Sequence, residues 1–137
     1  VVQKMVDSEK SGVMFTANPI TSDRDTMIVE AVYGLGEMIV QGTMTPDHWD
    51  VAKQPLKVTN FEIAVKDEMM VYEDEENKIV KVPENLEDKA ILREGGVLEI
   101  ARLGLKIEEH YGKPQDIEWA FVDGNFYIVQ SRPITTL

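Results

Sequence analysis

A change in hydrophobic periodicity at Pro83 is the feature that most constrains the fold. Before it, residues 1–82 are dominated by short β-rich segments separated by polar or glycine-containing breaks. After it, residues 86–111 repeat apolar side chains every three or four positions, as an amphipathic helix does. Two further strand-like segments, residues 116–122 and 126–132, close the chain. This order predicts an α+β fold with a mainly antiparallel sheet packed against helices.

Turn-forming residues set the expected boundaries. Strands are expected at residues 1–6, 12–16, 26–33, 48–52, 61–66, 69–72 and 79–82, and a short helix at 36–41. Gly95 and Gly96 each cost about 1 kcal/mol of helix propensity relative to alanine. We therefore expect a short helix, a break and a longer helix after Pro83. Gly112 followed by Pro114 should end the longer helix.

The charge balance restricts the partners. Asp and Glu number 25 against 14 Lys and Arg, for a net charge of −11, which repels nucleic acid and anionic membranes. The chain has no cysteine, no basic leader followed by an apolar stretch, and no apolar run long enough to span a bilayer. These features favour a cytoplasmic protein. An acidic chain can still bind a polyphosphate if a divalent cation bridges the two, or if basic residues come from elsewhere.

Both ends of the chain look internal to a longer polypeptide. Val1 to Val6 already form an apolar, strand-like segment without an initiator methionine, and Ile134 to Leu137 directly follow the last strand. We expect residues 1–137 to be a single partial domain.

The last two strands carry a candidate site. Asp116 and Glu118 alternate with Ile117, Trp119 and Phe121, so the two acids share one face. The pairing with the second strand depends on the loop. A two-residue turn at Asp123-Gly124 would pair Glu118 with Val129. A three-residue loop ending at Asn125, which can adopt the left-handed conformation, would pair Glu118 with Gln130 and Asp116 with Arg132. We favour the second register because it keeps the polar side chains together.

That register would bring two carboxylates, an amide oxygen and a guanidinium onto one face. Carboxylate and amide oxygens are hard ligands suited to Mg²⁺, and arginine binds phosphate through its fork of donors. The hairpin could therefore hold a magnesium–polyphosphate substrate. The alternative is a solvated sheet face with cross-strand ion pairs, which spacing alone favours.

Other candidates are weaker. Gly34-Leu35-Gly36-Glu37 follows a strand but lacks the remaining residues of a dinucleotide or Walker motif, so a turn into a short helix explains it better. Glu30 and Glu37 could contribute to a polar site. His48 and His110 have no metal-ligand partners at useful spacing, and we expect neither to be catalytic. Lys66 is expected at the surface.

The combined motifs resemble one family. They are Gln3-Lys4-Met5-Val6, Ser11-Gly12-Val13-Met14-Phe15-Thr16, Asn18-Pro19, Glu30-Ala31, Gly34-Leu35-Gly36-Glu37, Pro46-Asp47, Pro114-Gln115-Asp116-Ile117-Glu118-Trp119-Ala120 and Gln130-Ser131-Arg132-Pro133-Ile134. In order and spacing they resemble the nucleotide-binding domain of the pyruvate phosphate dikinase and phosphoenolpyruvate synthase family. Only residues 54–92 carry no recognised motif.

The resemblance implies the C-terminal half of an ATP-grasp-like domain that binds ATP and Mg²⁺. By matching position, Gln3 would border the adenine, and Asp116, Glu118, Gln130 and Arg132 would contact the nucleotide. Glu118 and Gln130 would be metal ligands, while Glu118 and Arg132 would carry catalysis.

The remaining parts would lie elsewhere in the parent chain. They are the N-terminal half with its phosphate-binding lysine and arginine, a swivelling phosphohistidine domain and a pyruvate-binding barrel. In phosphoenolpyruvate synthases a phosphoryl group passes from ATP to that histidine and then to pyruvate, so the isolated chain should be inactive. Alternatives are a rifampicin phosphotransferase, a pyruvate phosphate dikinase, or a non-catalytic acidic binding module of the same fold.

Overall fold

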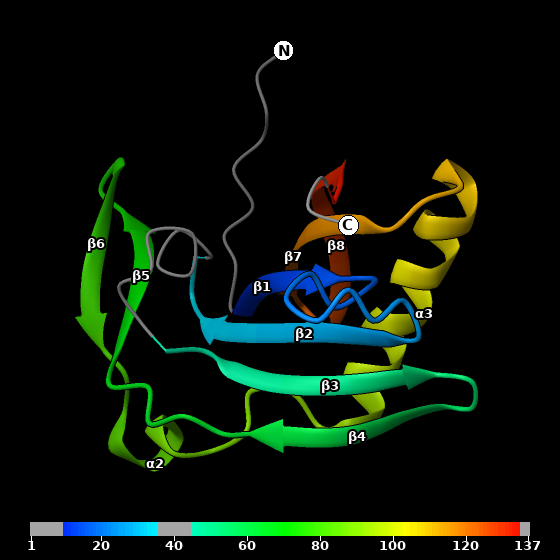
Figure 1. The fold of residues 1–137 in the computed structure, drawn as a ribbon. Helices are drawn as coiled ribbons and strands as arrows, with labels where there is room; N and C mark the ends of the chain where they lie inside the picture. Colours follow the sequence, from blue (N-terminus) through cyan, green and yellow to red (C-terminus); the bar gives the residue numbers. More distant parts are fainter. Residues whose placement is uncertain (1–9, 36–44, 135–137) are drawn as a thin grey trace.

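The computed structural model describes residues 10–35 and 45–134. Along the chain the elements are β1 (Lys10–Phe15), β2 (Thr26–Tyr33), β3 (Asp47–Lys53), β4 (Leu56–Glu62), β5 (Glu68–Glu73), β6 (Glu76–Lys81), α2 (Glu84–Glu87), α3 (Glu94–Tyr111), β7 (Gln115–Val122) and β8 (Asn125–Pro133) (Figure 1). The strand expected at residues 1–6 and the helix expected at 36–41 lie outside the described residues.

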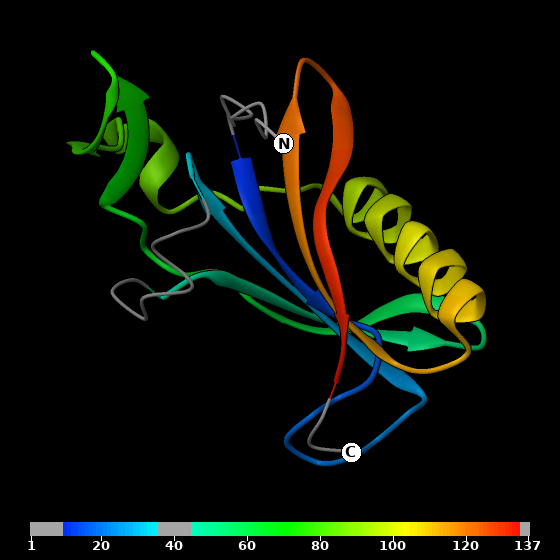
Figure 2. The ribbon, with the colours of Figure 1, turned by 90° about the horizontal axis from the view of Figure 1, so that it is seen from above.

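Six strands form one antiparallel sheet in the order β4-β3-β2-β1-β7-β8. Helix α3 lies along one face of this sheet, and β5 and β6 form a separate hairpin on the far side of the molecule from the C-terminal end of α3 (Figures 1 and 2). This confirms the expected α+β, ATP-grasp-like subdomain with a mainly antiparallel sheet and a C-terminal β-hairpin.

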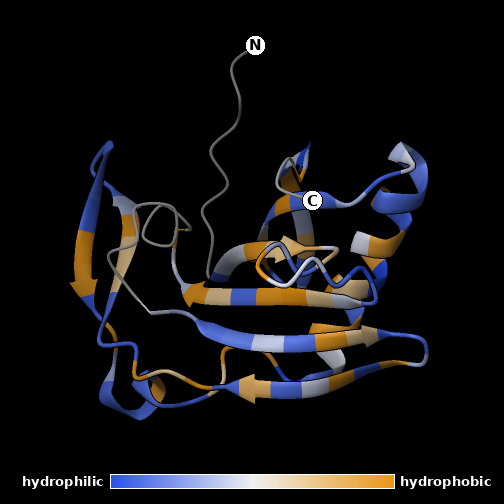
Figure 3. Ribbon diagram, viewed as in Figure 1, coloured by the Kyte–Doolittle hydropathy of each residue, from blue (hydrophilic) through white to orange (hydrophobic). Residues whose placement is uncertain are grey.

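The core lies between α3 and the sheet. Apolar residues at every second strand position face the helix, and Figure 3 shows the corresponding alternation along the ribbon. The buried set comprises Met14, Met27, Val29, Ala31, Trp49, Val51, Ile117 and Trp119 from the strands and Val97, Ile100 and Ala101 from α3. Because one face of the sheet is covered by this core, the polar residues at the intervening positions lie on the other face.

Helix α3 differs from expectation in two respects. It begins at Glu94, so Gly95 and Gly96 lie within its first turn rather than in a break. The first backbone N–H groups of a helix have no intrahelical partner, so glycine interferes less there than in the interior. Tyr111, expected on the apolar face, is 55% exposed because the helix ends there. Gly112 caps it in the left-handed conformation, as predicted. Among the described residues, no helix is long and apolar enough to cross a membrane.

Residues 54–92 supply the sheet edge and a small lobe. The strand expected at residues 61–66 lies earlier, as β4, and the acidic stretch Glu73–Glu76 forms the β5–β6 turn. The lobe is tied to the sheet by backbone and side-chain hydrogen bonds. Leu35 N donates to Met70 O at 2.8 Å, and Tyr33 Oη donates to Leu86 O at 3.0 Å.

The prediction that Lys66 lies at the surface is wrong. Its side chain is 0% exposed, and Nζ lies 2.6 Å from Oδ1 of Asp47, which is also 0% exposed. The carboxylate of Asp47 also accepts hydrogen bonds from the backbone N–H groups of Ala64 and Ile91, each at 2.9 Å. One buried acid thus fixes both ends of the segment that carries the β5–β6 lobe. The residues around Lys66 give no sequence signal of such a distant partner.

Candidate functional site

The β7–β8 hairpin has the predicted polar pairs, but its turn is shorter than predicted and β8 contains a bulge. Glu118 is opposite Gln130 and Asp116 is opposite Arg132, as expected. The loop, however, is a two-residue turn, because Val122 is paired with Asn125. Asp123 and Gly124 have φ values of 50° and 81°, the positive values that a type I′ turn requires at both central residues. The expected three-residue loop with a left-handed Asn125 is therefore wrong.

A β-bulge reconciles the short turn with the polar register. Trp119 is opposite Ile128, whereas Glu118 is opposite Gln130, so Val129 is an extra residue on β8. If Val129 were paired regularly with Glu118, the two-residue turn would place Gln130 opposite Ile117, on the apolar face. Because Val129 is bulged out of the pairing instead, Gln130 and Arg132 lie on the face of Glu118 and Asp116.

The four side chains differ in exposure. Arg132 Nε donates to Asp116 Oδ2 at 3.1 Å, and the arginine side chain is 62% exposed while the aspartate is 18% exposed. Asp116 therefore orients a guanidinium that remains accessible to a ligand. Glu118 is half-buried on β7, and Gln130 is exposed on the neighbouring edge strand β8. These oxygens face solvent on the side of the sheet opposite α3.

Gln115 fixes the base of this hairpin, a role that the sequence analysis missed. Its side chain is 1% exposed, Oε1 accepts from Ser131 Oγ at 2.9 Å, and its backbone N–H donates to Thr16 Oγ1 at 2.7 Å. These bonds join β7 to β8 and to the end of β1 immediately beside the Asp116–Arg132 pair. The sequence did offer one signal of this role: Gln115 alternates with Ile117 and Trp119 and is therefore a polar residue on the buried face of the strand.

The centre of the hairpin is fixed against β1. Trp119 is 1% exposed, and its Nε1 donates to Val13 O at 3.3 Å. A Cβ at Gly12 would lie 2.6 Å from the Trp119 ring and would also overlap the carbonyl oxygen of Glu30. Only glycine allows this close approach of the indole to β1.

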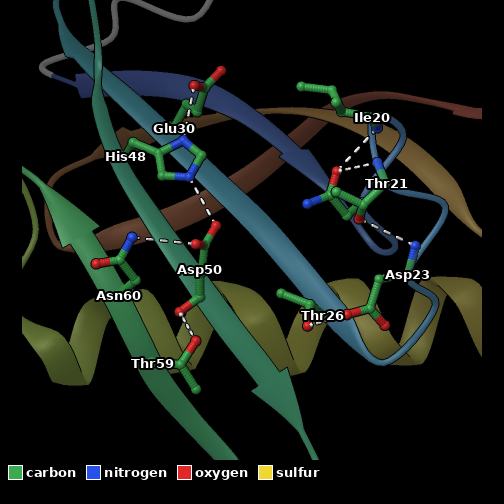
Figure 4. A network of polar contacts seen from close by, with 10 residues as sticks. Ile20, Thr21, Asp23, Thr26, Glu30, His48, Asp50, Thr59 and Asn60 are labelled. Carbon is green, nitrogen blue, oxygen red and sulfur yellow. Dashed lines mark hydrogen bonds and ion pairs between the residues drawn. The ribbon is translucent and has the colours of Figure 1, made fainter.

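The polar face continues across the sheet. Glu118 is opposite Val13, Val13 is opposite Glu30, and Glu30 is opposite His48, so these residues form one cross-strand row. The imidazole of His48 lies between two carboxylates: Nδ1 is 3.1 Å from Glu30 Oε2 and Nε2 is 2.8 Å from Asp50 Oδ1 (Figure 4). The hydrogen bond to Glu30 raises the pKa of His48 to about 9, partly opposed by burial and assisted by Asp50.

Several candidates lie outside this arrangement. Gln3, Gly36 and Glu37 are not among the described residues. Gly34 directly follows β2 with φ 73°, and a side chain there would overlap the carbonyl oxygen of Met70 on β5. These two features explain the need for glycine at this position without a phosphate-binding role. His110 lies at the end of α3, away from the polar face, and its lack of a catalytic role stays a prediction. Within residues 10–35 and 45–134, no cluster of three or more His, Cys, Asp or Glu side chains could hold a metal unaided.

Comparison with known proteins decides the family. The family model described as "Pyruvate phosphate dikinase, AMP/ATP-binding domain" matches residues 1–137. The chain belongs to this family. The dikinase-type domain is 48% identical over 138 residues to a probable phosphoenolpyruvate synthase of Methanocaldococcus jannaschii and 51% identical over 146 residues to a phosphoenolpyruvate synthase of Pyrococcus furiosus. It is also 43% identical over 139 residues to a rifampicin phosphotransferase of Bacillus cereus.

Each alignment includes all of this chain but only a small part of the relative. The dikinase-type domain spans 12% of the Methanocaldococcus protein, 18% of the Pyrococcus protein and 16% of the Bacillus protein. The similarity therefore extends over the full chain, whereas most of each relative has no counterpart in it.

Proposed function

We propose that this chain is the C-terminal half of an ATP-binding domain in a phosphoenolpyruvate synthase. The similarity of the whole of this chain to part of two proteins of that name supports the proposal. The structural observation that carries it is the bulged register of β7 and β8, which brings Asp116, Glu118, Gln130 and Arg132 to one accessible face.

Glu118 and Gln130 fit a magnesium site. Directly opposed residues on antiparallel strands have Cβ atoms about 4.5–5.5 Å apart, close enough for a carboxylate and an amide oxygen to converge on one ion. Magnesium is usually bound by one or two carboxylates together with water and substrate phosphates. Two protein ligands are thus enough, which agrees with the lack of a larger cluster among the described residues. When bound, Mg²⁺ would neutralise phosphate charge and fix the triphosphate.

Arg132 would bind the phosphates directly. Its Nε is held by Asp116, and the exposed guanidinium can offer its terminal nitrogens to phosphate oxygens. Phosphoryl transfer depends mainly on positioning and on charge stabilisation, rather than on covalent chemistry by the protein. Glu118 and Arg132 supply these effects from two adjacent strands. Gln115 and Gly12 keep the strands in place. Gln3 would border the adenine.

The reaction needs parts that we place in the rest of a longer chain. These are the other half of the ATP site with its basic residues, a swivelling domain with the acceptor histidine, and a barrel that binds pyruvate. The phosphoryl group would pass from ATP to the histidine and then to pyruvate. We place this enzyme in the cytoplasm, without nucleic-acid or membrane partners. A rifampicin phosphotransferase is the second candidate, favoured by the 43% identity to that relative.

The test is single-turnover phosphorylation of the acceptor histidine in the full-length enzyme. Loss of one preorganised electrostatic contact commonly costs about 10²–10³ in rate, so Glu118→Ala and Gln130→Ala should each lower the rate by at least that factor. Circular dichroism should remain that of the native enzyme. Glu109→Ala and His110→Ala, at exposed positions near the end of α3, are the matched controls and should retain most activity. Near-normal transfer in Glu118→Ala would refute the assignment of this hairpin.

A further inference from the structure

The Glu30–His48–Asp50 network must carry a proton on each nitrogen of its imidazole. Each nitrogen lies within hydrogen-bond distance of a carboxylate oxygen, and an ionised carboxylate can only accept. Both contacts therefore exist together only if His48 is an imidazolium. The three side chains are 26–27% exposed, so the network is partly desolvated. The raised pKa of His48, about 9, agrees with this geometry.

The surroundings of His48 are otherwise acidic. Glu62 on β4 is its cross-strand partner on the side away from Glu30. Asn60 Nδ2 contacts Asp50 Oδ2 at 3.5 Å, and Thr59 Oγ1 donates to the backbone carbonyl of Asp50 (Figure 4). The charged groups that face the imidazole from β2, β3 and β4 are thus Glu30, Asp50 and Glu62. His48 is the cation among them.

The network and the proposed metal site share one face of the sheet. Three strand spacings separate His48 from Glu118 through Glu30 and Val13, which amounts to roughly 14 Å at about 4.8 Å per strand. The residues between the two polar groups include Val13 and Ile28, which are apolar and buried. The charge of a polyanion held at Glu118 and Arg132 would therefore interact with the charges of this network over roughly that distance.

We infer that His48 is an electrostatic positioning residue for the nucleotide: its positive charge offsets Glu30 and Asp50 and so allows a magnesium–polyphosphate to settle on an acidic face. The inference rests on the proposed function of the hairpin. With the imidazolium, the two carboxylates and the ring carry a formal charge of −1, and without it −2. His48 contacts no reacting atom in this scheme, so its effect belongs to nucleotide affinity and not to the chemical step.

Coulomb's law sets the expected size of the effect. For about two net negative charges on the magnesium–triphosphate at roughly 14 Å, loss of one positive charge should weaken binding about threefold at the dielectric constant of water and about sevenfold at half that value. Salt screens exposed charges over about 10 Å at 0.1 M ionic strength, so the effect should shrink as salt is added.

The experiment uses the full-length enzyme and magnesium–ATP at low and high salt. His48→Gln should raise KM for magnesium–ATP about three- to sevenfold at low salt, with kcat nearly unchanged. His48→Lys keeps the positive charge and should stay close to the wild-type KM. Glu30→Gln combined with His48→Gln removes one negative and one positive charge and should restore KM. A role in packing alone would not be rescued by a second substitution in the same network.

Asp50→Asn tests the opposite sign. It keeps an oxygen acceptor for His48 but removes a negative charge, so KM should fall below that of the wild type. An unchanged KM in both His48→Gln and Asp50→Asn would overturn the inference, as would a double variant no better than His48→Gln. If His48→Gln does not fold, Asp50→Asn still decides. Failure of the proposed function has a different signature, because Glu118→Ala would then phosphorylate the acceptor histidine normally.

Discussion

The buried Lys66–Asp47 ion pair should make Lys66→Met one of the costliest single substitutions in this domain. The ammonium lies 2.6 Å from Asp47 Oδ1 and 2.7 Å from Ala64 O, and both side chains are fully buried. Methionine retains most of the aliphatic stem but leaves the carboxylate without its counter-charge. Removing one partner of a buried pair costs about 3–5 kcal/mol. That is a large share of the roughly 5–15 kcal/mol by which native domains are stable.

Urea denaturation followed by fluorescence of the buried Trp49 and Trp119 measures this loss. Lys78→Met is the matched control, because Lys78 pairs with Asp74 at 3.1 Å where the side chains are 36% and 77% exposed. An exposed pair contributes at most about 1 kcal/mol. Asp47→Asn combined with Lys66→Met removes both charges and should recover part of the loss. Equal losses in Lys66→Met and Lys78→Met would refute the reasoning.

Two further predictions concern packing and ligand binding. Gly12→Ala should destabilise the domain by at least about 1–3 kcal/mol, since its Cβ would overlap Glu30 O and the Trp119 ring, whereas Gly95→Ala, with open space around its Cβ, should be neutral or stabilising in the same urea titration. Residues 1–137 alone should bind magnesium–ATP weakly or not at all in titration calorimetry, because the chain has a net charge of −11 and, in our proposal, only half of the site; low-micromolar affinity would contradict this.

The hairpin shows what alternation can and cannot predict. The period of two in Asp116 to Phe121 correctly places the acids on one face, and the demand that polar residues stay together correctly pairs Glu118 with Gln130. Counting residues around the turn could not reveal that Val129 is bulged. An extra residue in a strand and an extra residue in a loop have the same effect on register, so the sequence alone favoured the wrong one.

Contacts between distant segments were beyond local patterns. Lys66 looked like a surface lysine because the acids next to it in the sequence, Asp67 and Glu68, are not its partners, and Asp47 reaches it only through the fold. The same applies to Gln115 and to His48, whose partners Ser131 and Glu30 are 16 and 18 residues away. Periodicity predicted most of the described strands and the long helix α3, whereas these polar contacts depend on which strands become neighbours.

The bulge at Val129 has a consequence for comparing this domain with its relatives. The bulge lies between the turn and the Glu118–Gln130 pair, so the register of the polar pairs depends on the bulge as well as on the length of the turn. A relative that lengthens the turn by one residue and lacks the bulge would keep the same four side chains on the same face. Insertions and deletions at these two positions can therefore compensate one another during evolution. An alignment gap at the hairpin tip is then no sign that the four proposed ligand-binding residues have been lost.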